Sequence, residues 1–80
     1  MSELEIKQAL KEFFCNDLGV EESELEFDTP LFEEGIGLDS IDSIELISFI
    51  DGEFDVQMTG VDKSHFRTID TLASYIVSNR

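Results

Sequence analysis

The sequence predicts an all-α protein: a small four-helix bundle of three main helices and one short helix, with a long ordered loop after the first. In three separate segments, apolar residues recur every three to four positions, which is the spacing of an amphipathic helix. No segment is predicted to be a strand. A length of 80 residues is enough for one hydrophobic core, so we expect a single domain spanning residues 1–80.

The first helix is predicted from about Glu3 to Asp17, and Gly19 marks its end. Its buried face is predicted to consist of Ile6, Leu10, Phe13 and Phe14. Cys15 falls on the opposite face and is expected to be a surface thiol. Because it is the only cysteine, an internal disulfide is excluded, which favours a reducing, intracellular compartment.

A long connection follows, over residues 20–38. Five apolar residues recur along it and can pin it to the core: Leu25, Phe27, Leu31, Phe32 and Ile36. Pro30, Gly35 and Gly37 supply bends, and residues 22–25 are compatible with a helical turn. The connection is therefore predicted to be an ordered crossover.

The central helix is predicted from Ser40 to about Phe54. Asp39 has the short carboxylate of a helix N-cap, which accepts hydrogen bonds from the free amides of the first turn. Asp42 adds a second acid where the helix dipole favours one. Ser40 is then the first helical residue, with its hydroxyl facing solvent at a helix N-terminus suited to carry a phosphate.

The apolar residues of this helix do not share one face. The core stripe is expected to be Leu46, Ile47, Ile50 and Phe54. Ile41 and Ile44 lie on roughly the opposite side, and Ser48 completes their row. Two interpretations are open at this point: the pair forms a small docking surface, or loops or another helix cover it.

The remaining residues are predicted to form a brief turn and a last helix. The turn covers residues 59–64, with Thr59 as a cap, Asp62 at the third position and Phe66 as an anchor in the core. Thr68 is expected to cap the last helix. The apolar stripe of that helix is Ile69, Leu72, Ala73 and Ile76.

Charge separates this chain from several classes of protein. Nineteen acidic residues face five basic ones, for a net charge of −14. The bases lie near the two ends of the chain: Lys7, Lys11, Lys63, Arg67 and Arg80. The electrostatic field of this charge distribution repels nucleic acid and anionic lipid. It attracts basic protein surfaces to the middle of the chain. With no membrane-length apolar run and no basic start of a signal peptide, we expect a cytoplasmic monomer that binds neither membrane nor nucleic acid.

Catalytic and metal-binding chemistry find little support in the sequence. Ser40 has no base, oxyanion site or metal ligands in its local sequence, and the only histidine, His65, lies in the distant short turn. The counts of cysteine and histidine exclude a cluster of those ligands. We therefore expect no catalytic residue and no metal site.

One acidic segment partly matches the ligand pattern of a calcium-binding loop. The oxygen-bearing residues at the corresponding positions are Asp51, Glu53, Asp55, Gln57, Thr59 and Asp62. The sixth position, which needs glycine for a sharp turn, is Val56, and the last ligand is a short aspartate. Binding would also take Phe54 out of the core. The match is therefore poor, and calcium binding is kept only as part of an alternative.

Asp39-Ser40-Ile41 resembles the Asp-Ser-Leu attachment motif of acyl carrier proteins. The resemblance spans nearly the whole chain, through Leu18-Gly19-Val20, Leu31-Phe32-Glu33-Glu34, Asp42-x-x-Glu45-Leu46, Glu53-Phe54-Asp55, Thr68-Ile69 and Tyr75-Ile76. The tripeptide alone would be uninformative. Together with these further matches along the chain, the resemblance is specific.

The resemblance implies a carrier that is not an enzyme. A phosphopantetheinyl transferase would attach 4'-phosphopantetheine from coenzyme A to Ser40, and the thiol of that arm would hold acyl groups as thioesters. In the family, the second helix meets basic patches on acyl-transferring and chain-extending enzymes. The implied docking residues are Asp39, Ile41, Asp42, Ile44, Glu45, Asp51 and Glu53.

Departures from the pattern of fatty acid synthesis leave the pathway open. Ile41 replaces the usual leucine, Ser48 replaces an apolar docking residue, and seven phenylalanines could narrow a pocket for the acyl chain. Housekeeping fatty acid synthesis and a specialised lipid, aryl polyene or polyketide pathway all remain open. The rival class is an unmodified acidic protein-binding module, calcium-dependent or mimicking a nucleic-acid surface.

Overall fold

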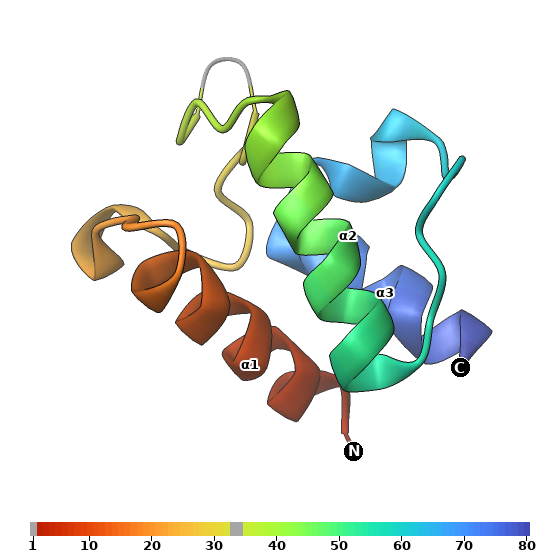
Figure 1. The fold of residues 1–80 in the computed structure, drawn as a ribbon. Coiled ribbons are helices and arrows are strands. Elements are labelled where there is room, and N and C mark those ends of the chain that lie inside the picture. Colours follow the sequence, from red (N-terminus) through yellow and green to blue (C-terminus); the bar gives the residue numbers. More distant parts are fainter. Residues whose placement is uncertain (1, 33–34) are drawn as a thin grey trace.

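The computed structural model describes residues 2–32 and 35–80. It contains three α-helices, α1 (Glu3–Asn16), α2 (Ser40–Phe54) and α3 (Ile69–Asn79), and two 3-10 segments, η1 (Glu22–Glu24) and η2 (Lys63–Phe66) (Figure 1). The described residues include no strand, only an isolated parallel bridge between Phe32 and Leu38. The predicted all-α class is confirmed. The count of four helices is approximate, because both short segments are 3-10 turns.

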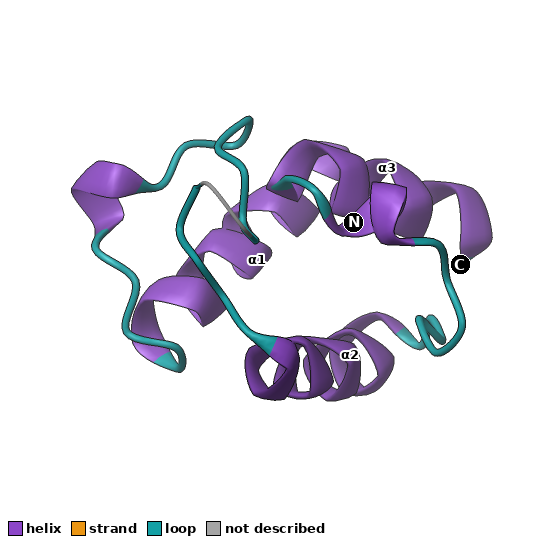
Figure 2. Ribbon diagram, turned by 90° about the horizontal axis from the view of Figure 1, so that it is seen from above, coloured by secondary structure: helices purple, strands orange, loops and turns teal. Residues whose placement is uncertain are grey.

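The three helices form two sides of the molecule. Seen from above, α2 lies on one side and α1 and α3 lie on the other (Figure 2). An ion pair links α1 to the start of α3, since Lys7 Nζ lies 2.8 Å from Asp70 Oδ1. Both chain ends lie at the lower side of Figure 1, away from the N-terminus of α2.

One hydrophobic core joins the three helices. The stripes predicted for α1 and α3 are confirmed in full. On α2, Leu46, Ile50 and Phe54 are buried as expected, but Ile47 is only partly buried because it faces a cavity described below. Cys15 was expected on the surface and is instead half-buried against the core.

Aromatic rings fill the core between α1 and the C-terminal half of α2. Phe13 stacks on Phe49 with 4.3 Å between ring centroids. Phe14 meets Phe13 edge-on, and Phe54 meets Phe49 edge-on. Such arrangements add attraction beyond the burial of apolar area. The rings therefore fix α1 and α2 against each other at this end.

The crossover between α1 and α2 is ordered over its described residues, as predicted. Leu25 and Leu31 are completely buried. The Leu31 amide donates a hydrogen bond to the Arg67 carbonyl oxygen, 2.9 Å away. At Gly35 a Cβ would lie 1.7 Å from the carbonyl oxygen of Pro30, so only glycine fits this close turn. The glutamates of the Leu31-Phe32-Glu33-Glu34 match lie outside the described residues.

The short segment before α3 differs in detail from the prediction. Thr59 is not its cap and Asp62 is not at its third position, because η2 begins at Lys63 and Asp62 is its N-cap. Asp62 Oδ1 accepts a hydrogen bond from the Ser64 amide at 2.9 Å. That backbone hydrogen bond holds the pKa of Asp62 below its ordinary value. Phe66 packs against the core as predicted, although it is only partly buried.

Candidate functional site

Local hydrogen bonds fix the N-terminus of α2. Asp39 is extended, and its Oδ1 accepts hydrogen bonds from the Ile41 and Asp42 amides, each at 3.0 Å. Asp42 Oδ2 accepts one from the Asp39 amide at 3.1 Å, which completes a capping box. The predicted cap is therefore confirmed, and it sets the first residue of the helix at Ser40.

Ser40 is exposed at the first position of α2, as predicted. Its hydroxyl makes no hydrogen bond to the described residues, whereas its carbonyl oxygen accepts one from Ser43 Oγ at 2.8 Å. One part of the sequence argument changes, because Asp39 already occupies two of the amides expected to face a phosphate on Ser40. The positive end of the helix dipole remains available to an anion there.

The apolar pair on the outer side of α2 is solvent-exposed. Ile41 and Ile44 are each 66% exposed, so neither a loop nor a helix of the described residues covers them. Asp39, Glu45, Asp51 and Glu53, which the sequence grouped with this pair, are also exposed. Asp42 is half-buried, because its side chain turns back to the Asp39 amide. The geometry thus favours docking over the covered alternative.

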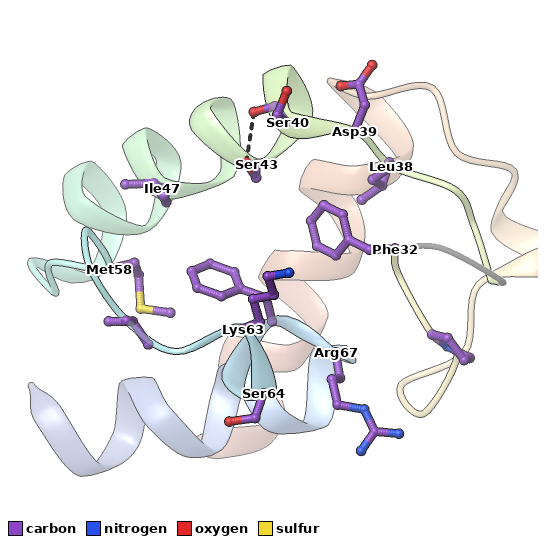
Figure 3. Close-up of a pocket in the computed structure, with 14 residues that line it drawn as sticks. Phe32, Leu38, Asp39, Ser40, Ser43, Ile47, Met58, Lys63, Ser64 and Arg67 are labelled. Atoms are coloured by element: carbon purple, nitrogen blue, oxygen red, sulfur yellow. Dashed lines mark hydrogen bonds between the residues drawn. The ribbon is translucent and has the colours of Figure 1, made fainter.

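A cavity of about 740 Å³ lies beside Ser40, between the N-terminal half of α2 and the segment around η2 (Figure 3). Its apolar lining comes from the crossover, α2, η2 and the segment between the last two: Pro30, Phe32, Leu38, Ile47, Met58, Val61 and Phe66. Asp39, Ser40, Ser43 and Lys63 add polar groups. A cavity of this size is in the range that encloses small organic ligands.

Sequence reasoning did not locate this cavity or its lining. Its far wall includes Met58 and Val61, and the segment after α2 was predicted only to link two helical elements. A usable signal was present, because apolar and polar residues alternate through Phe54-Asp55-Val56-Gln57-Met58. Phe54, Val56 and Met58 are all buried. Alternation of this kind indicates an extended segment with one face against the core.

The histidine and the oxygen-bearing residues of the calcium-loop match do not line the cavity. His65, on η2, contacts Tyr75 with 4.9 Å between ring centroids and does not line the cavity. Across residues 2–32 and 35–80, no cluster of three or more His, Cys, Asp or Glu could hold a metal ion. The calcium-loop arrangement is not formed, because Asp51 and Glu53 lie within α2 and Phe54 is buried at its end. In the same described ranges, no helix is long and apolar enough to cross a membrane.

Comparisons with known proteins agree with this geometry. The family model described as "Phosphopantetheine attachment site" matches residues 8–76. The acyl carrier proteins of Chlorobium phaeobacteroides and Chlorobium phaeovibrioides are 31% and 32% identical to this chain over 77 residues. That of Chlorobium luteolum is 31% identical over the same length. Each alignment covers 96% of this chain and 97% of the relative.

The matched region contains α2, the cavity lining and most of α1 and α3. Membership implies a covalently attached 4'-phosphopantetheine arm and interaction with a phosphopantetheinyl transferase and biosynthetic enzymes. The chain belongs to the acyl carrier protein family, whose members are carriers and not enzymes.

Proposed function

We propose that this protein holds acyl groups as thioesters on a 4'-phosphopantetheine arm attached to Ser40 and presents them to biosynthetic enzymes. The observation that carries the proposal is the position of Ser40. Its exposed hydroxyl is at the start of α2, on the rim of an apolar cavity. A transferase can reach such a hydroxyl from solvent, and cargo on an arm attached there can fold back into the cavity.

Mass spectrometry tests the attachment site. Incubation with coenzyme A and a broad-specificity phosphopantetheinyl transferase is expected to add the mass of one arm to the wild type and none to Ser40→Ala. Ser43→Ala is the matched control, because Ser43 lies one turn further along α2 and lines the same cavity. Modification that persists in Ser40→Ala, or a wild type refractory to several transferases, would show that Ser40 is not the site.

The lining of the cavity supports an acyl cargo. Burying an apolar chain is worth about 0.8 kcal/mol per methylene, so a chain next to Phe32, Ile47 and Phe66 gains free energy on leaving water. Fatty acid, polyketide and other specialised lipid pathways all supply acyl thioesters of this kind.

The exposed side of α2 supports a docking function. The acidic residues around Ile41 and Ile44 can attract a basic partner surface, whereas the two isoleucines give a short-range apolar contact. Charges at the rim of an interface mainly affect the association rate, and buried apolar contacts mainly affect the lifetime of the complex.

Stopped-flow binding to the transferase across a salt series tests this division. Glu45→Lys is expected to slow association and to flatten its salt dependence. Ile44→Ala is expected to shorten the lifetime of the complex at a nearly unchanged association rate. Circular dichroism first establishes that both variants fold. Equal and salt-independent losses in the two variants would place the docking surface elsewhere.

A further inference from the structure

Lys63 is the cation of the cavity. It is the first residue of η2 and faces the N-terminal half of α2 across the hollow. In Figure 3 its side chain reaches into the space between these two elements, whereas the side chain of Arg67, the other basic residue of the lining, extends away from it. The end of the Lys63 side chain is therefore placed to meet cargo that enters from Ser40.

No salt bridge of the described residues involves Lys63, and its charge acts on the neighbouring Asp62, where, after the hydrogen bond from the Ser64 amide, it helps to lower the pKa of that carboxyl. The ion pairs of Lys7 with Glu3 and Asp70 lie on α1 and at the start of α3, and neither involves Lys63. The neighbouring Asp62 uses its carboxylate to cap the Ser64 amide. Lys63 is exposed at the edge of the cavity and forms no ion pair with another described residue there, so its ammonium group can meet an anion that enters.

The electrostatics of the cavity narrow the possibilities. A net charge of −14 opposes the entry of any anionic group, and Asp39 on the rim adds to that repulsion. A wholly apolar cargo would need no cation in the wall, since an ammonium group loses hydration when apolar surface covers it. Lys63 is exposed at the mouth of the cavity, and a charge-assisted contact with an anion there is favourable.

We propose that Lys63 binds an anionic oxygen group in the cavity mouth. This inference rests on the proposed attachment at Ser40. Two sources supply such a group: a free carboxylate at the far end of a dicarboxylic acyl cargo, or the phosphodiester of the arm itself. Both would form an ion pair with Lys63 that a neutral acyl chain cannot form.

Four forms of the protein separate the two sources: unmodified, carrying the bare arm, loaded with hexanoyl, and loaded with adipoyl. The two cargoes have six carbons each and differ by one terminal carboxylate. Melting temperatures at low salt are compared for the wild type, Lys63→Gln and the matched control Arg67→Gln, which removes one charge from a side chain directed away from the cavity. Mass spectrometry verifies each loaded state.

If the cargo carboxylate is the partner, the wild-type adipoyl form melts a few degrees above the hexanoyl form, and Lys63→Gln abolishes that difference. If the phosphodiester is the partner, the melting temperature of Lys63→Gln falls below that of the wild type once the bare arm is attached. Loading with either cargo then leaves this difference unchanged. Arg67→Gln follows the wild type in both cases. Lys63→Gln shifting all four forms equally overturns the inference and leaves the attachment intact. Failure to attach any arm at Ser40 overturns the proposed function instead.

Discussion

The two halves of α2 are built differently, although one continuous helix contains them both. In the C-terminal half, Ile50 and Phe54 are buried and Phe49 stacks on Phe13 of α1. The N-terminal half exposes Ile44 to solvent on one side and borders the cavity on the other. The C-terminal half, which we call the packed half, holds the fold together. The N-terminal half, which we call the hollow half because it borders the cavity, leaves room for cargo and partners.

This division separates stability from function along a single helix. Filling the space near Ser40 would gain packing energy but would remove the site that the arm and its cargo can use. The packed half must therefore supply the stability that the hollow half does not. The predictions below test this separation.

The largest expected effect comes from removing a ring at the packed end. Phe14 is completely buried, so Phe14→Ala is expected to cost about 3–5 kcal/mol of unfolding free energy. A domain of 80 residues has roughly 4–12 kcal/mol in total, so this variant should be largely or wholly unfolded. Phe66→Ala at the cavity wall is the control and should cost clearly less, because one side of that ring already faces open space. Urea denaturation measures the unfolding free energy of both variants. Equal losses would show that the packed end and the cavity end of the molecule do not differ in this respect.

The next largest effect compares two isoleucines of the same helix. Ile50→Ala is expected to cost about 2–5 kcal/mol, because Ile50 is completely buried. Ile44→Ala is expected to change stability by less than about 0.5 kcal/mol, because that side chain is 66% exposed. Chemical denaturation of the two variants gives both values. A large loss in Ile44→Ala would assign Ile44 to the core and not to the docking surface.

A smaller effect is expected from salt. Sixteen acids lie between Lys11 and Lys63 without a basic residue among them, and α2 with its exposed Asp51 and Glu53 is in this stretch. Screening their repulsion should raise the melting temperature by a few degrees, since single interactions between exposed charges are worth below about 1 kcal/mol. Calorimetry from low to moderate ionic strength measures the change. A melting temperature indifferent to salt would refute self-repulsion.

The smallest effect concerns the ion pair between α1 and α3. The hydrogen bond to the Asp70 carboxylate raises the pKa of Lys7 above its ordinary value. Because the pKa is raised in the folded state, the stabilisation is fully present below the ordinary lysine pKa and is lost as the pH rises through the folded value.

Lys7→Met should therefore be slightly less stable than the wild type at pH 9, and the difference should disappear at strongly alkaline pH. Lys11→Met controls for the loss of one charge from the same helix. Thermal melts over this pH range provide the measurement. A difference that stays constant with pH would mean that the charge of Lys7 is not what stabilises the fold.

Much of the fold could be predicted because its signals are local. The period of apolar residues located the buried faces of α1 and α3, and the caps at Asp39 and Thr68 set the first residues of α2 and α3. The geometry of one helix also placed Ile44 on the side opposite the core stripe, while its exposure was left open by the sequence. Each of these features depends on residues less than about four turns apart.

The features that could not be predicted depend on contacts between distant segments. Ile47 fits the core stripe of α2 by periodicity, but no helix packs over it and it lines the cavity instead. Lys63 faces Ser40 only because η2 folds back beside α2. Cys15 is half-buried although its helical phase pointed outward. Spacing within one element carries no information on what lies opposite it.

The hydrogen bonds of the crossover also determine which wall of the cavity can move. The Leu31 amide bonds to the Arg67 carbonyl, and the Asp70 amide bonds to that of Phe27, so the crossover is joined to the start of α3 by its backbone. Within the described residues, no backbone hydrogen bond joins the body of α2 to α1, η2 or α3. Swelling of the cavity around a longer cargo would therefore move the N-terminal half of α2, while the stacked rings of Phe13 and Phe49 hold its C-terminal half against α1. In hydrogen exchange, the Leu31 and Asp70 amides would keep their protection while that displacement occurs.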